Sequence, residues 1–186
     1  MAERLVKGVH LKNVAEFVRK KRGAAGLKEL LEGYNAKKPK GARLDFSKID
    51  EREMYSYDAY LDLLKMADKV VGRGDLSRIE EMGSHTVQHL GHLSYLARAP
   101  NIHDFIEGAA KNWRSVYSFG ELEYVKEGTR KVVLRYHDFP QERAKCMYFK
   151  GSIEGMLALC RLKGTVTETA CNTKGKEYCE YTIEWV

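Results

Sequence analysis

The sequence predicts an α+β fold, in which a mainly helical part, residues 1–118, precedes a hairpin, a helix and a second hairpin in residues 119–186. Apolar residues recur at helical spacing through the first part, and after Phe119-Gly120 they alternate as they do in strands. Together the two hairpins predict a four-stranded antiparallel sheet packed with helices. The length of 186 residues suits a single domain.

Two apolar stripes at helical spacing begin the chain. The first starts at Leu11 and ends at Gly23, and the second runs from Leu27 to Tyr34. Basic side chains just before Gly23 suit the negative end of a helix dipole. Residues 35–50 are polar and contain Pro and Gly, so we expect a loop there.

Three further helical stretches follow that loop. Apolar residues from Tyr57 to Val71 predict an amphipathic helix that ends at Gly72. Asp75 is expected to cap the next helix, whose inner residues are Leu76, Ile79, Met82 and Leu90. Pro100-Asn101 interrupts the pattern, which resumes from Ile102 to Val116.

Alternating apolar residues then predict strands. Leu122 and Tyr124 precede the Glu127-Gly128 turn, and a matching set follows it: Val132, Leu134 and Tyr136. A second hairpin is expected from Thr165 to Cys171 and back from Tyr178 to Trp185, with Tyr181, Ile183 and Trp185 on one face. The helix between the hairpins contains Ile153, Met156, Leu157 and Cys160.

Gly151 and Gly155 lie one turn apart in this helix. Because they have no side chains, another backbone can approach them closely. We expect the helix to pack tightly against the sheet through this face.

The formal charge of +6 is concentrated near the N-terminus. Residues 1–50 hold 13 Lys and Arg against 6 Asp and Glu, a net charge of +7. The basic runs lack interleaved aromatic residues, which favours a solvated surface over nucleic-acid binding. The first residues contain no apolar signal segment, and no apolar run is long enough to span a membrane. We therefore expect a soluble, cytoplasmic protein without a membrane partner.

The spacing of Cys146, Glu168, Cys171 and Cys179 is typical of one tetrahedral metal site. Three thiolates and a carboxylate would satisfy Zn²⁺ and leave no position for a catalytic water, which predicts a structural role. An alternative is that Cys146 and Cys160 are buried core thiols, while Cys171 and Cys179 face each other across a hairpin. A disulfide there would need an oxidising compartment.

The predicted site makes a geometric demand on the chain. Glu168 and Cys171 are three positions apart, so their side chains would point to opposite faces of an unbroken strand. A bulge or turn near Thr169-Ala170 is needed before both can reach one ion.

The segment from Cys146 to Gly155, together with Glu168-Thr-Ala-Cys171, Gly175 and Cys179-Glu-Tyr181, resembles the vinyl-reductase-type (4-vinyl reductase) domain. It is most similar to the sensor modules of aromatic-hydrocarbon-responsive bacterial transcription activators, in which the matching cysteines and glutamate bind zinc. The order of elements also resembles a wider superfamily that includes haem-nitric-oxide-binding domains and TRAPP trafficking subunits. The opening Val6-Lys-Gly8-Val-His-Leu11 is similar to the start of the haem-binding branch.

The resemblance implies a pocket between helices and sheet, in which a His and a Trp hold a polar group on an aromatic ligand. By order of elements these are His85 and Trp113, and the next candidates are His103, Tyr117 and Phe105. Ordinary roles compete with this assignment, since a Trp at helical spacing is usually core and a His is more often hydrogen-bonded or at the surface.

The histidines allow two other interpretations. His85, His89 and His92 have a spacing that can bind a metal, but no Glu stands where the metalloprotease motif requires one, so we interpret them as a polar face. The superfamily makes haem ligation by His103 conceivable. The Tyr-x-Ser-x-Arg clamp of that family is absent, however, because the comparable strand reads Tyr136-His-Asp138-Phe-Pro140. We therefore expect no haem.

No phosphate-binding loop, nucleophile elbow or acid–base pair is identifiable, so an enzyme is not the favoured interpretation. The resemblance favours a sensor or ligand-binding domain that takes a small hydrophobic molecule, acts through an effector protein and forms a homodimer through its N-terminal helices. Two alternatives stay open. One is a role in tetrapyrrole reduction with a nicotinamide or flavin. The other is an interaction adaptor with a filled core.

Overall fold

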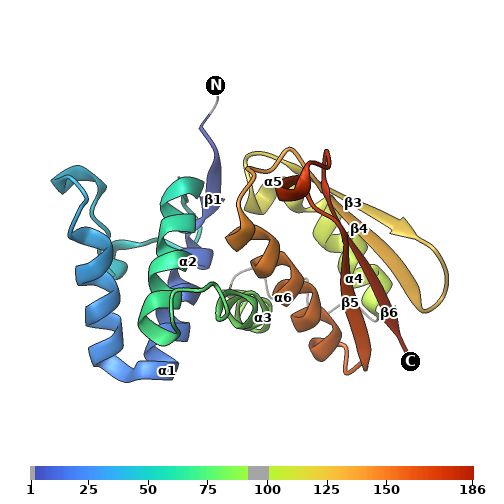
Figure 1. Ribbon diagram of the computed structural model, residues 1–186, viewed down its shortest axis with the longest axis horizontal. Helices are drawn as coiled ribbons and strands as arrows, with labels where there is room; N and C mark the ends of the chain where they lie inside the picture. Colours follow the sequence, from blue (N-terminus) through green and yellow to red (C-terminus); the bar gives the residue numbers. More distant parts are fainter. Residues whose placement is uncertain (1–2, 92–100) are drawn as a thin grey trace.

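The first elements of the chain form a pair of helices joined by a short ribbon. The computed structural model describes residues 3–91 and 101–186. Strand β1 (Leu5–Lys7) leads into the long helix α1 (Gly8–Asn35), and β2 (Met54–Ser56) leads into α2 (Tyr57–Val71). β1 and β2 pair antiparallel, and α1 packs along α2 (Figure 1). This ribbon was not predicted, since three-residue strands are too short to show alternation.

Gly23 divides α1 at the predicted place. Its φ of 67° lies in the left-handed region and interrupts the helical backbone, after which the helix resumes. The two expected stripes are therefore two arms of one kinked element. The loop expected at residues 35–50 lies at 36–53, and it contains two short 3-10 helices, Lys40–Ala42 and Phe46–Lys48.

The middle of the chain is broken into shorter helices than predicted. α2 ends before Gly72 as expected, and α3 spans Ile79–Gln88. The single stretch predicted from Ile102 to Val116 is divided at Asn112 into α4 (Ile102–Lys111) and α5 (Trp113–Val116). Of the histidine series, His92 and its part of the expected polar face lie outside the described residues.

Asp75 does not cap α3, contrary to the prediction. Its carboxylate accepts a hydrogen bond from the Ser77 amide within the preceding turn. The fully buried Asp68 instead accepts from the amides of Leu76 and Arg78, at the start of α3. A cap supplied from another helix has no local sequence signature, which explains the error.

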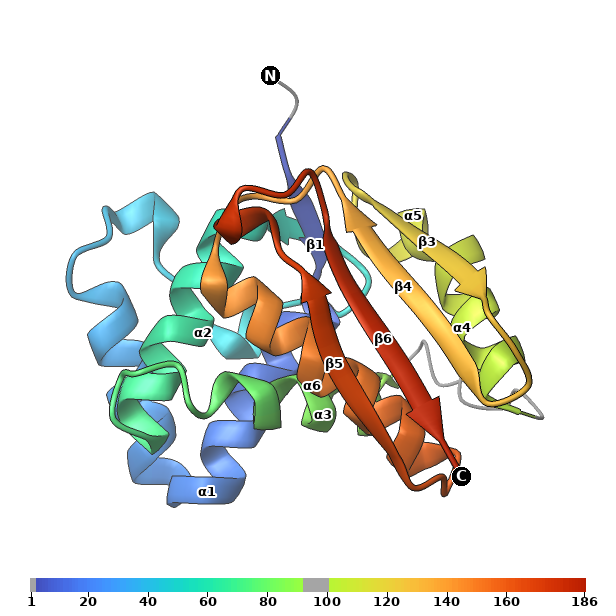
Figure 2. The same cartoon turned by 45° about the vertical axis from the view of Figure 1, so that its right-hand side comes forward.

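The second part forms the predicted four-stranded antiparallel sheet. Its strands are β3 (Glu121–Lys126), β4 (Lys131–His137), β5 (Gly164–Ala170) and β6 (Cys179–Trp185), in the order β3-β4-β6-β5. Helix α6 (Arg143–Leu159) connects the two hairpins. Figure 2 shows α4, α5 and α6 behind the sheet, all on one face. The predicted α+β fold is confirmed.

The two helical glycines have a different partner from the one we expected. A Cβ on Gly151 would overlap the carbonyl oxygen of Glu80 in α3, and a Cβ on Gly155 would crowd Ser84. Gly83 of α3 leaves room for the Tyr148 carbonyl in return. The close approach predicted for α6 is therefore made to α3, which lies on the side of α6 away from the sheet (Figure 1).

Candidate metal cluster and apolar cavity

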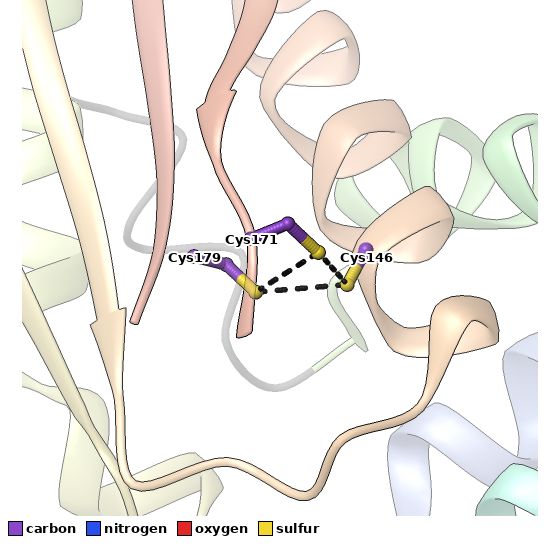
Figure 3. A group of neighbouring side chains, drawn as sticks. All are labelled: Cys146, Cys171 and Cys179. Atoms are coloured by element: carbon purple, nitrogen blue, oxygen red, sulfur yellow. Dashed lines mark hydrogen bonds between the residues drawn. The ribbon is translucent and has the colours of Figure 1, made fainter. Parts of the chain in front are cut away.

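Three of the four predicted metal ligands meet at one end of the sheet. Cys146 is in the first turn of α6, Cys171 follows β5 and Cys179 begins β6. Their Sγ atoms are 3.4 Å (146 to 171), 3.6 Å (146 to 179) and 3.8 Å (171 to 179) apart (Figure 3). All three side chains are buried, and all are free thiols. We call these three residues the cysteine cluster.

The bulge predicted near Thr169-Ala170 is present. The pairing of β5 with β6 shifts between Glu168 and Ala170, so the register slips by one residue immediately before Cys171. The extra residue turns the Cys171 side chain out of strand alternation and toward α6. This prediction, made from the spacing of two residues, is confirmed.

The carboxylate of Glu168, beside the cysteine cluster, forms ion pairs with two basic side chains. Its Oε1 accepts from Arg143 Nη1, and Lys174 Nζ lies 3.0 Å from its Oε2. The same Arg143 nitrogen is 3.9 Å from Cys171 Sγ. Burial acts to raise the pKa of Glu168, but hydrogen bonds and charge from Lys174 and Arg143 outweigh it and leave that pKa below its usual value. Within the described residues, the sulfur atoms of the three cysteines lie within 4.8 Å of one another and could hold one metal ion, and Glu168 is not part of this group. Glu168 therefore stays a predicted fourth ligand.

The thiols of Cys146 and Cys179 differ in pKa. A hydrogen bond with Cys146, and then contacts with the Asn172 amide and Lys145, lower the pKa of Cys179. The same hydrogen bond, and burial, raise the pKa of Cys146. One thiolate is thus favoured before any ion is bound, and thiolate is the form that binds metals. Cys160 lies apart at the end of α6, where it is only partly buried.

An apolar cavity lies between the helices and the sheet. The space open to water-sized molecules has a volume of about 90 Å³. Its walls come from α3, α4, α5, α6, β3, β4 and the start of α1. The side chains that line it include Phe105, Ala109, Trp113, Tyr117, Tyr136 and Phe149. Among the described residues that line it, none is Asp, Glu, Lys or Arg. Such a cavity excludes charged ligands, because nothing in its wall would compensate a buried charge.

The aromatic walls are ordered by stacking. Trp113 stacks on Tyr117 with ring centroids 4.5 Å apart, and Tyr136 stacks on Phe149 at 4.0 Å. The indole Nε1 of Trp113 donates to the Phe119 carbonyl, which holds the ring in place. Trp113, Tyr117 and Phe105, three of the residues assigned to the pocket, line the cavity.

Two expected pocket residues lie elsewhere. His85 faces α1, where its ring contacts Phe17 and stacks on His89. His103 lies against the ends of the sheet. Its Nδ1 is 2.7 Å from the Tyr124 hydroxyl, and its Nε2 is 3.0 Å from the Thr129 carbonyl. Neither histidine lines the cavity.

The cavity has polar side chains that the sequence analysis missed. His10 and Tyr148 both line it, and His10 Nδ1 lies 3.0 Å from the Tyr148 hydroxyl. Burial raises the pKa of Tyr148 to about 12, so its hydroxyl stays neutral. A sequence signal for His10 existed, since it is four and seven positions from Val14 and Phe17 on the apolar stripe of the first helix.

The sequence itself has no recognisable relatives in two comparisons, since no protein-family model and no curated protein matches it. Among the described residues, none of the helices is long and apolar enough to cross a bilayer.

Solved structures with the same fold are found, however. An H-NOX protein from S. oneidensis in the Fe(II)NO ligation state aligns with a TM-score of 0.75 at 15% identity, covering 97% of this chain and 99% of that chain. An H-NOX domain from Shewanella oneidensis in the Fe(II)CO ligation state gives 0.74 at 17% identity, over 97% and 98%. An oxygen binding H-NOX domain related to soluble guanylate cyclases gives 0.73 at 13% identity, over 96% and 94%. At such identities the likeness establishes the fold, which is that of H-NOX domains.

Proposed function

We propose that this chain is a sensor domain that binds a small, neutral, apolar molecule in its cavity. The observation that carries the proposal is the apolar cavity between the helices and the sheet, lined largely by ordered aromatic rings. A filled core would have favoured the interaction adaptor considered above. The H-NOX neighbours, described in ligated states with NO, CO and oxygen, support a small-molecule role for this fold.

The size of the cavity limits the ligand. An apolar cavity of about 150 Å³ accepts benzene, and the space here is about 90 Å³. A ligand of about one ring would fit after small movements of the lining side chains. The stacked rings of the wall favour an aromatic ligand, in agreement with the resemblance to the vinyl-reductase-type sensors.

Haem is the cofactor that the structural neighbours suggest, because one of them was solved to probe the function of heme distortion in the H-NOX family. The residues of this chain do not fit it. His103 does not line the cavity, and both of its ring nitrogens already have partners in the β3–β4 hairpin. Trp113, Tyr117 and Phe149 fill space that a four-pyrrole macrocycle would need. We therefore propose a ligand other than haem.

The cysteine cluster fits a structural zinc ion. Tetrahedral Zn²⁺ with Zn–S bonds of about 2.3 Å places its sulfurs about 3.8 Å apart, close to the 3.4 to 3.8 Å found here. Cys146, Cys171 and Cys179 would hold the ion, and Glu168 would complete the site after leaving an ion pair. The ion would join the start of α6 to both arms of the last hairpin.

A sensor must pass its signal on. We propose an effector protein and a homodimer as the partners, following the resemblance to the activator modules.

Ligand binding is tested with toluene as the probe and Ala109→Phe as the blocking variant. Ala109 lines the cavity, so the new ring occupies the ligand space. The exposed Ala25 on α1 gives a matched control, Ala25→Phe. Calorimetry should show saturable toluene binding to the wild type and to Ala25→Phe, and at least tenfold weaker binding to Ala109→Phe. Equal binding by all three chains would refute the cavity as the site.

The haem alternative has its own measurement. Protein produced with haem supplied should show no Soret band. A stoichiometric band that disappears in His103→Ala would establish haem and overturn the proposal.

A further inference from the structure

Lys145 is a fully buried cation beside the cysteine cluster. It precedes Cys146 in the first turn of α6, and its residue is 1% exposed. Its Nζ donates to Asn172 Oδ1 at 2.9 Å and to Cys179 Sγ at 3.3 Å. The ammonium also lies 5.8 Å from the centroid of the Phe139 ring. Buried lysines are rare unless they are paired, so this amine requires a partner.

No carboxylate in the described part of the chain lies within ion-pair distance of Lys145. Glu168, the acidic residue predicted for the site, is already paired with Arg143 and Lys174. The amide oxygen of Asn172 supplies a hydrogen bond but no charge. Within the described residues, the group in contact with Lys145 that can carry negative charge is the sulfur of Cys179.

The charges balance if the cluster holds a divalent metal ion. Three thiolates and one divalent cation have a net charge of −1, and the ammonium of Lys145 reduces this to zero. Before an ion binds, a single thiolate at Cys179, which Lys145 contacts, would compensate the ammonium, so this amine stays paired with and without the ion. As a fourth ligand, Glu168 would add one negative charge together with the two cations that pair with it, Arg143 and Lys174.

The hydrogen bonds also fix the position of one ligand. Asn172 donates its backbone amide to Cys179 Sγ at 3.4 Å and its side-chain amide to the Phe139 carbonyl at 2.9 Å. Lys145 joins this arrangement by bonding both Asn172 and Cys179. Cys179 is therefore held from two directions before an ion is present.

We propose that Lys145 is a positioning residue of the metal centre, whose ammonium compensates the negative charge of three metal-bound thiolates and holds Cys179 in its binding position. This inference rests on the metal site of the proposed function.

The test measures zinc affinity by competition with a chromogenic chelator. Lys145→Met removes the charge but keeps the length of the side chain, and Lys145→Gln keeps a hydrogen-bond donor without charge. Both should bind zinc about 10- to 100-fold more weakly than the wild type, as variants of outer-shell residues do. The matched control is Lys150→Met, on the same helix, because Lys150 pairs with Glu80 and Glu154. It should stay within about twofold of the wild type.

Cobalt spectra separate positioning from a general loss of fold. Each variant loaded with Co²⁺ should keep a thiolate-to-cobalt charge-transfer band, shifted from that of the wild type in the two Lys145 variants alone. Wild-type affinity in Lys145→Met overturns the inference, and wild-type affinity in Lys145→Gln overturns the role of charge. A wild-type chain that binds no zinc overturns the metal site as well.

A measurement on the unaltered chain covers the case in which neither variant folds. In the zinc-loaded protein, the Lys145 ammonium should give a slowly exchanging ¹⁵N-coupled proton signal that broadens when zinc is removed. If that signal is missing while zinc is bound, the inference is wrong.

Discussion

His85 is a buried histidine that does not line the cavity. It is 8% exposed, and among the described residues its Nε2 has no hydrogen-bond partner. Burial, and then the charge of the neighbouring His89, lowers the pKa of His85 to about 4. The other charged groups that act on it are Lys20, Lys21 and Glu16 of α1. The contact between α1 and α3 therefore depends on a neutral imidazole.

This lowered pKa predicts an acid-sensitive stability. Between pH 6.5 and about 4 the unfolded chain binds a proton at His85 that the folded chain does not. Stability should be full above pH 6.5 and should fall as the pH drops toward 4, by up to about 3 kcal/mol from this group. Urea unfolding across this range should give a flatter profile for His85→Leu than for the wild type.

His137→Gln serves as the control, because His137 is a partly exposed residue of β4 that pairs with Glu123. It should keep the sensitivity due to His85. If His85→Leu shows the wild-type pH profile, buried His85 is not the acid-sensitive group.

At the scale of elements, α3 and α6 cross with their backbones in close contact. Gly83, Gly151 and Gly155 lie where a side chain would meet the backbone of the other helix. Lys150 adds an ion pair with Glu80 across this crossing. Because α6 also carries Cys146 and the cavity residue Tyr148, the position of this helix sets the geometry of both sites.

Gly151→Ala should therefore destabilise the protein. The added methyl group overlaps the Glu80 carbonyl, and backbone cannot give way as a flexible side chain can. We expect a loss of about 3 kcal/mol or more, from overpacking. Gly128→Ala is the control, since no atom lies near its Cβ position. Thermal melts of the two variants give the comparison, and equal melting temperatures would show that the helices can separate at no cost.

The sequence predicts elements in this chain better than it predicts their partners. Alternation of Leu122 with Tyr124, and the spacing of Glu168 from Cys171, are local signals, and the hairpin and the bulge follow from them. The glycines of α6 predict a close contact, but they do not indicate which element makes it. The pairing of β4 with β6 and the capping of α3 by Asp68 join positions that are distant in the sequence. The spacing of residues in the sequence does not predict such interactions.

The same limit explains the candidate sites. The cysteine spacing was informative because metal ligands must converge on one point, which constrains the chain between them. The pocket histidines were assigned from the order of elements alone, and order does not fix which face of a helix points inward. His85 and His103 accordingly lie outside the cavity, and His10 lines it.

At the scale of the whole molecule, α6 connects the two candidate sites. Its first turn holds Cys146, and the following turns present Tyr148, Phe149, Ser152 and Met156 to the cavity. The Tyr181 hydroxyl of β6 donates to the Cys146 carbonyl at 2.8 Å, which ties the helix start to the sheet. Any ion in the cysteine cluster would thus also order one wall of the cavity.

Metal removal should therefore loosen one part of the molecule selectively. Treatment of zinc-loaded protein with a chelator should increase hydrogen exchange in the start of α6, in the segment from Cys171 to Cys179 and in β6. Exchange in the α1 and α2 pair should change little, because those helices pack against each other and against α3. The physical reason is that the ion bonds to Cys146, Cys171 and Cys179 together, so its removal frees the three segments that carry them.

Two serine variants make this prediction specific. Cys171→Ser removes a ligand and should reproduce the exchange pattern of the metal-free protein, with a lower melting temperature. Cys160→Ser changes a thiol outside the cluster and should behave as the wild type. Uniform exchange over the whole chain after chelation would mean that the metal stabilises the fold as one unit. No change in exchange, with no zinc found by elemental analysis, would mean that the three sulfurs meet only as buried thiols.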